Sequence, residues 1–127
     1  MDYVLNVKRL RMQQVLNSID GGNGPGMIEL RDSARVILCT LVMPRPSFYL
    51  VGPDLVLCAP VSGFVSIAGV ATIATISDGS GILIVDNMTV GVDVTEDNVH
   101  DYEVVLDTTT LDVGKQVTIV TATLEHG

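Results

Sequence analysis

Hydrophobic residues recur with two different spacings along this chain of 127 residues. Over residues 4–19 apolar side chains return at every seventh position, at Leu5, Met12 and Ile19, with others on the adjoining turns. This spacing predicts one amphipathic helix. A run rich in glycine follows at residues 21–26, and it predicts the end of the helix because neither a helix nor a strand crosses such a run easily.

Beyond the glycines the apolar positions form short or alternating runs separated by turn residues, which predicts strands. Asp32-Ser33-Ala34 predicts a hairpin or a corner, and Asp78-Gly79-Ser80-Gly81 is the strongest turn signal in the chain. We therefore expect the strands on either side of residues 78–81 to pair. The predicted strands cover residues 27–31, 35–43, 48–51, 55–59, 61–67, 70–76, 82–85, 90–94, 103–106 and 116–124.

Strands at this spacing are typical of an antiparallel β-sandwich or jelly roll. Composition agrees, because 47% of the residues are hydrophobic but Trp is absent, so the core must be built from Val, Ile, Leu and Ala. The length suits one domain and offers no material for a second core. The prediction is therefore a mainly β fold with one short N-terminal helix, with residues 1–24 as the helix or arm and residues 25–127 as a single β-sandwich body.

The last predicted strand carries apolar residues on both faces. Val117 and Ile119 alternate on one face, and Val120, Ala122 and Leu124 occupy the other. A strand with two covered faces is either an inner strand or one that lies between subunits. Val120, Ala122 and Leu124 are therefore the candidate apolar contact for self-association as a homodimer or homotrimer.

The charges divide along the chain. The first 50 residues carry six cations and four carboxylates, a net charge of +2, and the remainder carries one cation and eleven carboxylates, a net charge of −10. The basic end suits a polar or negative partner surface, while the acidic part repels other copies and favours solubility. The candidate residues for partner docking are Lys8, Arg9, Arg11, Arg31 and Arg35.

Few residues suit chemistry. Cys39 and Cys58 lie in apolar runs, which indicates small buried hydrophobic side chains and leaves a disulfide or a thiol nucleophile as lesser alternatives. The acidic stretch Asp93–Asp101 offers oxygen ligands for calcium, but it lacks the glycine and terminal glutamate of a helix–loop–helix calcium site and indicates a solvated loop. The sequence therefore assigns no catalytic, cofactor or metal residue.

Other function classes fit poorly. A glycosidase needs opposed carboxylates with aromatic platforms for sugar rings, and the chain has no Trp. No Gly-x-Ser-x-Gly element supports a serine triad, and the net charge of −8 disfavours nucleic-acid binding. No apolar run is long enough for a membrane span, and cations interrupt the N-terminal segment where an export signal would need an apolar run. The sequence therefore predicts that this protein is not an enzyme and binds neither nucleic acid nor membrane.

The order of these elements resembles a group of small structural proteins encoded in the head and tail gene clusters of tailed bacteriophages and prophages. The likeness covers most of the chain, and only residues 44–60 do not match the pattern. It lies in the N-terminal helix and glycine break followed by Gly26-Met-Ile-Glu-Leu-Arg31, Asp78-Gly79-Ser80-Gly81, Leu106-Asp107-Thr-Thr-Thr-Leu and the closing stretch from Val113 to Leu124.

The resemblance implies a capsid decoration, or cement, protein with a jelly-roll or sandwich body. Such a protein is made in the host bacterial cytoplasm and lies on the capsid surface of the virion, where it binds the outside of the expanded major-capsid lattice and stabilises the head. The expected partners are the major capsid protein and further copies of the chain. The resemblance brings no catalytic residues. The alternative is a receptor- or carbohydrate-binding module associated with a phage tail.

Overall fold

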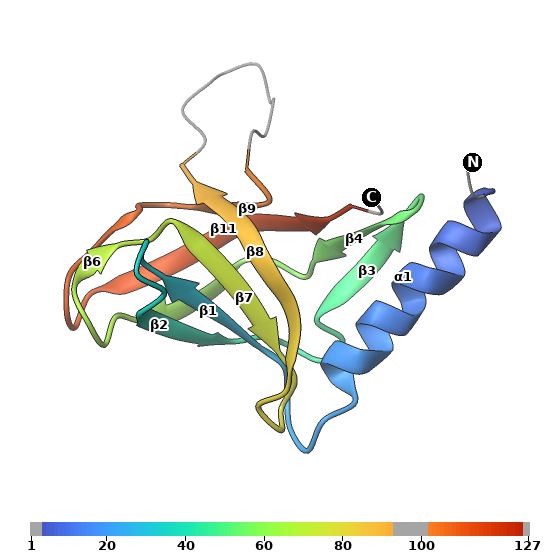
Figure 1. The fold of residues 1–127 in the computed structure, drawn as a ribbon, viewed down its shortest axis with the longest axis horizontal. Coiled ribbons are helices and arrows are strands. Elements are labelled where there is room, and N and C mark those ends of the chain that lie inside the picture. The colour runs from blue at the N-terminus through green and yellow to red at the C-terminus, as the bar shows by residue number, and fades with distance from the viewer. Residues whose placement is uncertain (1–3, 93–101, 126–127) are drawn as a thin grey trace.

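The computed structural model describes residues 4–92 and 102–125, and it has a mainly β fold with one N-terminal helix (Figure 1). The helix, α1, spans Leu5–Asp20. The strands are β1 (Met27–Arg31), β2 (Ile37–Val42), β3 (Phe48–Val51), β4 (Asp54–Leu57), β5 (Val61–Phe64), β6 (Gly69–Val70), β7 (Ile73–Ser77), β8 (Leu83–Gly91), β9 (Val104–Leu106), β10 (Thr110–Leu111) and β11 (Gln116–Leu124).

Most of the strands form one large sheet that curls over a single core. Its order is β2-β1-β7-β8-β9-β11-β4-β3, with β5 also paired to β11, while β6 and β10 form a separate two-stranded sheet. Strand β2 comes close to β5, where the Ser66 amide donates to the Leu38 carbonyl at 2.8 Å and the Cys39 thiol donates to the Phe64 carbonyl at 3.3 Å. Opposite parts of the sheet therefore enclose the core as in a β-sandwich. The predicted fold class is confirmed.

Helix α1 packs on the sheet through its C-terminal half. Met12, Leu16 and Ile19 are its buried side chains, and their spacing of four and three residues places them on one face. They join the same hydrophobic core as the strands, and α1 contacts β3, β4 and β8. The predicted helix is confirmed, with its observed start and end each one residue later than expected.

Two side chains fix the C-terminal end of α1. The Arg45 guanidinium donates to the carbonyls of Asp20 at 2.6 Å, Gly22 at 3.0 Å and Gly24 at 2.9 Å. The Asp20 carboxylate in turn accepts a hydrogen bond from the Ser47 hydroxyl at 2.8 Å. The last carbonyls of a helix lack hydrogen-bond donors within the helix. Arg45 supplies a donor to the Asp20 carbonyl at the helix end and to two carbonyls of the loop that follows. These contacts hold α1 to the segment that leads into β3.

Several predicted strands are confirmed and three differ. The strands predicted over residues 27–31, 48–51 and 116–124 match β1, β3 and β11, and the two predicted turns join β1 to β2 and β7 to β8 as antiparallel neighbours. The strand expected over residues 70–76 is divided between β6 and β7, which lie in different sheets. The short strand β10 was not predicted, because two residues carry no periodic signal.

The two strands expected at residues 82–85 and 90–94 form one continuous strand, β8. Its polar middle contains Asn87, which has a φ of 54°. Asparagine tolerates this left-handed conformation better than most residues, so the strand continues through an irregularity and does not end there. Beyond it, β8 runs parallel to β9, whereas the other strand pairs of the described residues are antiparallel. The sheet is therefore antiparallel, as the sequence predicts, except at this one pair of the described strands.

Candidate functional site

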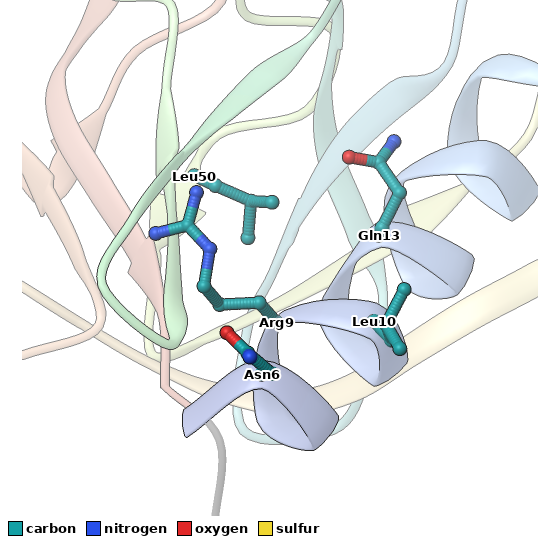
Figure 2. A pocket seen from close by; sticks show the side chains of 5 residues that line it. All are labelled: Asn6, Arg9, Leu10, Gln13 and Leu50. Atoms are coloured by element: carbon teal, nitrogen blue, oxygen red, sulfur yellow. The ribbon is translucent and has the colours of Figure 1, made fainter. Parts of the chain in front are cut away.

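Helix α1 and strand β3 line a surface groove with a volume of about 410 Å³. Its lining residues are Asn6, Arg9, Leu10 and Gln13 of the helix and Leu50 of the strand, and Figure 2 shows the Leu50 and Arg9 side chains beside the β3–β4 hairpin. The helix residues are spaced as neighbours on one stripe of an α-helix. This stripe borders the buried face of α1, so the groove follows the line where the helix leaves the sheet.

Arg9 connects the two walls of the groove. Its Nη1 donates to the Gly52 carbonyl, in the turn between β3 and β4, at 3.2 Å. Within the part of the chain that the structure describes, Arg9 has no carboxylate partner. A half-buried guanidinium with donors to spare is suited to bind a carboxylate that enters the groove.

Apolar side chains are also exposed along the first half of the helix, and one of them, Leu10, lines the groove. Val4, Leu5 and Leu10 are 68%, 52% and 68% exposed, and Val7 is also exposed. Several exposed apolar side chains within one short segment favour contact with another molecule. We use the name docking end for residues 4–10 together with the groove.

The five cations expected to dock together are spread over the molecule. Lys8 and Arg11 are three residues apart and share one side of α1, whereas Arg9 is turned about 100° from Lys8 and reaches the β3–β4 hairpin. Arg31 ends β1, and Arg35 lies in the turn between β1 and β2. Strand β1 leads away from the C-terminal end of α1, so the last two cations do not belong to the docking end (Figure 1). The single basic surface that the sequence suggested is therefore not present.

The charges of Arg31 and Arg35 are balanced within the chain. Arg31 lies 3.1 Å from the Glu29 carboxylate and also donates to the Thr75 hydroxyl at 3.2 Å. Arg35 lies 2.6 Å from the Asp86 carboxylate. This hydrogen bond to Arg35 lowers the pKa of Asp86, with the Asn87 amide contributing further. Arg31 thus links β1 to β7 through Thr75, Arg35 links the β1–β2 turn to β8, and each already has a carboxylate partner.

The candidate contact for self-association is also divided. The pairing of β11 with β9 shifts between Ile119 and Thr121, so Val120 is an extra residue in the strand. One inserted residue reverses which side chains face the core. Ala122 and Leu124 are consequently 0% and 5% exposed in the chain's own core, while Val120 is 53% exposed. The interpretation of all three as one exposed contact was wrong, and only Val120 lies at the surface.

Cys39 is the small buried side chain that the sequence predicts, whereas Cys58 is less buried than predicted. Cys39 is buried, Cys58 is half-buried, and both are free thiols. Burial raises the pKa of the Cys39 thiol, which disfavours the reactive thiolate. The acidic stretch Asp93–Asp101 lies outside the described residues. Elsewhere in the described chain, no group of three or more His, Cys, Asp and Glu side chains is arranged to hold a metal ion.

Sequence reasoning selected Arg9 but missed the rest of the groove. Asn6, Leu10 and Gln13 share a helical stripe, which is a visible signal, but Leu50 comes from a distant segment. Only the packing of α1 beside β3 brings these residues together.

No protein-family model, curated protein or solved structure matches this chain. Among the helical residues that the structure describes, none form a helix long and apolar enough to cross a membrane.

Proposed function

We propose that this protein is a capsid decoration protein of a tailed bacteriophage or prophage, which binds the outside of the expanded major-capsid lattice. The observation that carries the proposal is the docking end, where exposed apolar side chains lie on one half of α1 together with Arg9, which has no carboxylate partner among residues 4–92 and 102–125. The C-terminal half of the same helix is anchored in the core, so the docking end is presented by a firmly held element.

The apolar side chains of the docking end are few enough to give a modest affinity, which suits a protein that binds many equivalent sites on one shell. Fully burying a Val or Leu side chain contributes about 1.5–3 kcal/mol, so partly exposed residues such as Val4, Leu5 and Leu10 would each contribute about 1–2 kcal/mol. Association entropy offsets part of this sum, which leaves a modest affinity for each copy. A protein that binds only the expanded lattice still stabilises it by mass action, and repetition over the shell multiplies the effect.

The charge distribution also supports attachment through the docking end. Residues 51–127 carry a net charge of −10, whereas residues 4–11 at the start of α1 hold Lys8, Arg9 and Arg11 and no carboxylate. Neighbouring copies on a shell would repel through their acidic bodies and attach through the less negative end. Closed dimers or trimers at symmetry positions of the lattice remain part of the proposal, and light scattering on the purified chain measures their mass.

Purified particles provide the test. We expect a copy number comparable to that of the major capsid protein, measured by quantitative mass spectrometry of virions. The double variant Leu5→Gln and Leu10→Gln should reduce shell occupancy without changing the unfolding midpoint. Val113→Gln is the matched control, because Val113 is 63% exposed in the turn before β11.

A copy number of only a few per particle would contradict the proposal. It would favour the alternative of a tail-associated receptor- or carbohydrate-binding module. Equal occupancy of the double variant and the control would show that the docking end is not the attachment surface.

A further inference from the structure

We propose that the groove between α1 and β3 binds an extended, acidic peptide segment of a partner protein as an additional strand on β3. The inference deepens the proposed function, since on a phage head the segment would belong to the major capsid protein. Its basis, in the part of the chain that the structure describes, is a strand edge without a second strand, a helix wall with suitable polar groups, and the Arg9 guanidinium without a carboxylate partner.

The free edge belongs to β3. This strand ends the sheet order, and its only strand partner in the described chain is β4. At its start the Ser47 amide donates to the Asp20 carboxylate, but residues 48–51 form no backbone hydrogen bonds to any described element other than β4. In an antiparallel sheet, alternate residues of such a strand direct N–H and C=O groups outward. Proteins that capture peptides by strand addition use the same feature.

The two walls have matching lengths. Strand β3 has four residues and therefore spans about 13 Å. Asn6 and Gln13 are separated by seven residues, which is about 10 Å along a helix. A peptide strand of three or four residues thus fits along both walls.

The helix wall supplies groups that suit an extended backbone. The Asn6 and Gln13 carboxamides each carry donors and an acceptor for peptide amides, and Figure 2 shows both on the groove side of α1. Leu10 and Leu50 offer apolar contact to alternate side chains of the peptide. Strand addition supplies affinity through the backbone, and such side-chain contacts supply specificity.

Arg9 sets the charge of the partner. It lies in the groove without a carboxylate partner in the described chain, and its remaining donors can bind an Asp or Glu side chain in two-point geometry. A second copy of the chain is the less favoured occupant, because two molecules that each carry a net charge of −8 repel one another.

A titration followed by two-dimensional ¹H–¹⁵N NMR on the full chain tests the inference. The probe is a peptide of alternating valine and threonine with a central glutamate, acetylated at its N-terminus and amidated at its C-terminus. The control peptide is identical except for a glutamine at the centre. We expect saturable shift changes confined to residues 6–13 and 48–51, and about tenfold weaker binding of the glutamine peptide. Methylating the peptide amides that face β3 should abolish binding, whereas methylating the intervening amides should not.

Two variants separate charge recognition from general electrostatics. Arg9→Gln should weaken binding of the glutamate peptide about tenfold and make the two peptides equal. Lys115→Gln changes the net charge by the same amount at an exposed position near the start of β11, and it should leave both affinities unchanged. Equal losses in the two variants would overturn the assigned role of Arg9.

The remaining outcomes are also decisive. Absence of shifts at residues 48–51 with both peptides at millimolar concentration would overturn the inference. Shifts at these residues on concentrating the protein alone would show that a second copy occupies the edge. If the protein binds the peptide but is absent from virions, the proposed function is refuted and this inference stands. If the protein is abundant on virions but does not bind the peptide, this inference is refuted and the proposed function stands.

Discussion

Replacing Leu124 with alanine should destabilise the fold by about 2–3 kcal/mol. Leu124 is 5% exposed and lies beside Met12 and Val15 of α1 and Val85 of β8. A buried leucine-to-alanine change costs about 2–5 kcal/mol, depending on how far the surroundings collapse into the space. A surface hollow of about 220 Å³ borders the same residues, so water and neighbouring side chains can fill the space and the lower part of the range applies.

The matched control is Val120→Ala on the same strand. Val120 is 53% exposed, so its truncation should change the free energy of unfolding by less than about 1 kcal/mol. Urea unfolding followed by circular dichroism measures both variants, and an unchanged m-value shows that the stability itself differs. Light scattering measures the mass in parallel. If Leu124→Ala unfolded like the wild type but had a smaller mass, Leu124 would lie between subunits and the assignment of its side chain to the chain's own core would be refuted.

Three further predictions concern the end of α1, the turn between β7 and β8, and the Arg35–Asp86 ion pair. Arg45→Gln should lower the free energy of unfolding by about 1–3 kcal/mol in urea titrations, because the Asp20 carbonyl at the end of α1 and the Gly24 carbonyl in the following loop lose their donor. Gly79→Ala should cost about 2 kcal/mol or more by the same assay, since its added Cβ would lie 2.1 Å from the Gly24 carbonyl oxygen and the backbone must shift. Arg35 lowers the pKa of Asp86 in the folded state, so this carboxylate stabilises the fold at neutral pH and loses that effect as the pH falls below its unfolded pKa of about 4. The urea midpoint of Asp86→Asn should therefore lie below that of the wild type at pH 7 and approach it in acid, and a constant difference at both pH values would contradict the assigned ion pair.

The local pattern of apolar and polar residues was sufficient to predict the helix and most of the strands. The periodic apolar residues of α1 and the alternation in β1 and β11 are properties of neighbouring residues, and each appears in the structure at or near its predicted bounds. The turn at residues 78–81 was predicted for the same reason, because its glycines and aspartate act over a few residues. The failures occurred where local signals compete with the sheet: at Asn87 a strand continues through a polar interruption, since its pairing partners extend on both sides.

The candidate sites depended more strongly on distant contacts. Charge along the sequence grouped Arg31 and Arg35 with the helix cations, but Arg31 pairs with Glu29 on its own strand and Arg35 pairs with the distant Asp86 of β8. The groove could not be predicted, because Leu50 and Arg9 are brought together only when α1 packs beside β3.

The sequence by itself determined the mainly β class, the single N-terminal helix and the division of charge, because composition and short-range periodicity are fully present in the linear chain. Only the tertiary structure decided which faces of those elements are buried. One extra residue at Val120 reverses the exposure of the side chains that follow it, so Ala122 and Leu124 lie in the core. The anchoring of α1 by Met12, Leu16 and Ile19 likewise leaves its first half exposed, because the sheet covers only the part of the helix that it contacts.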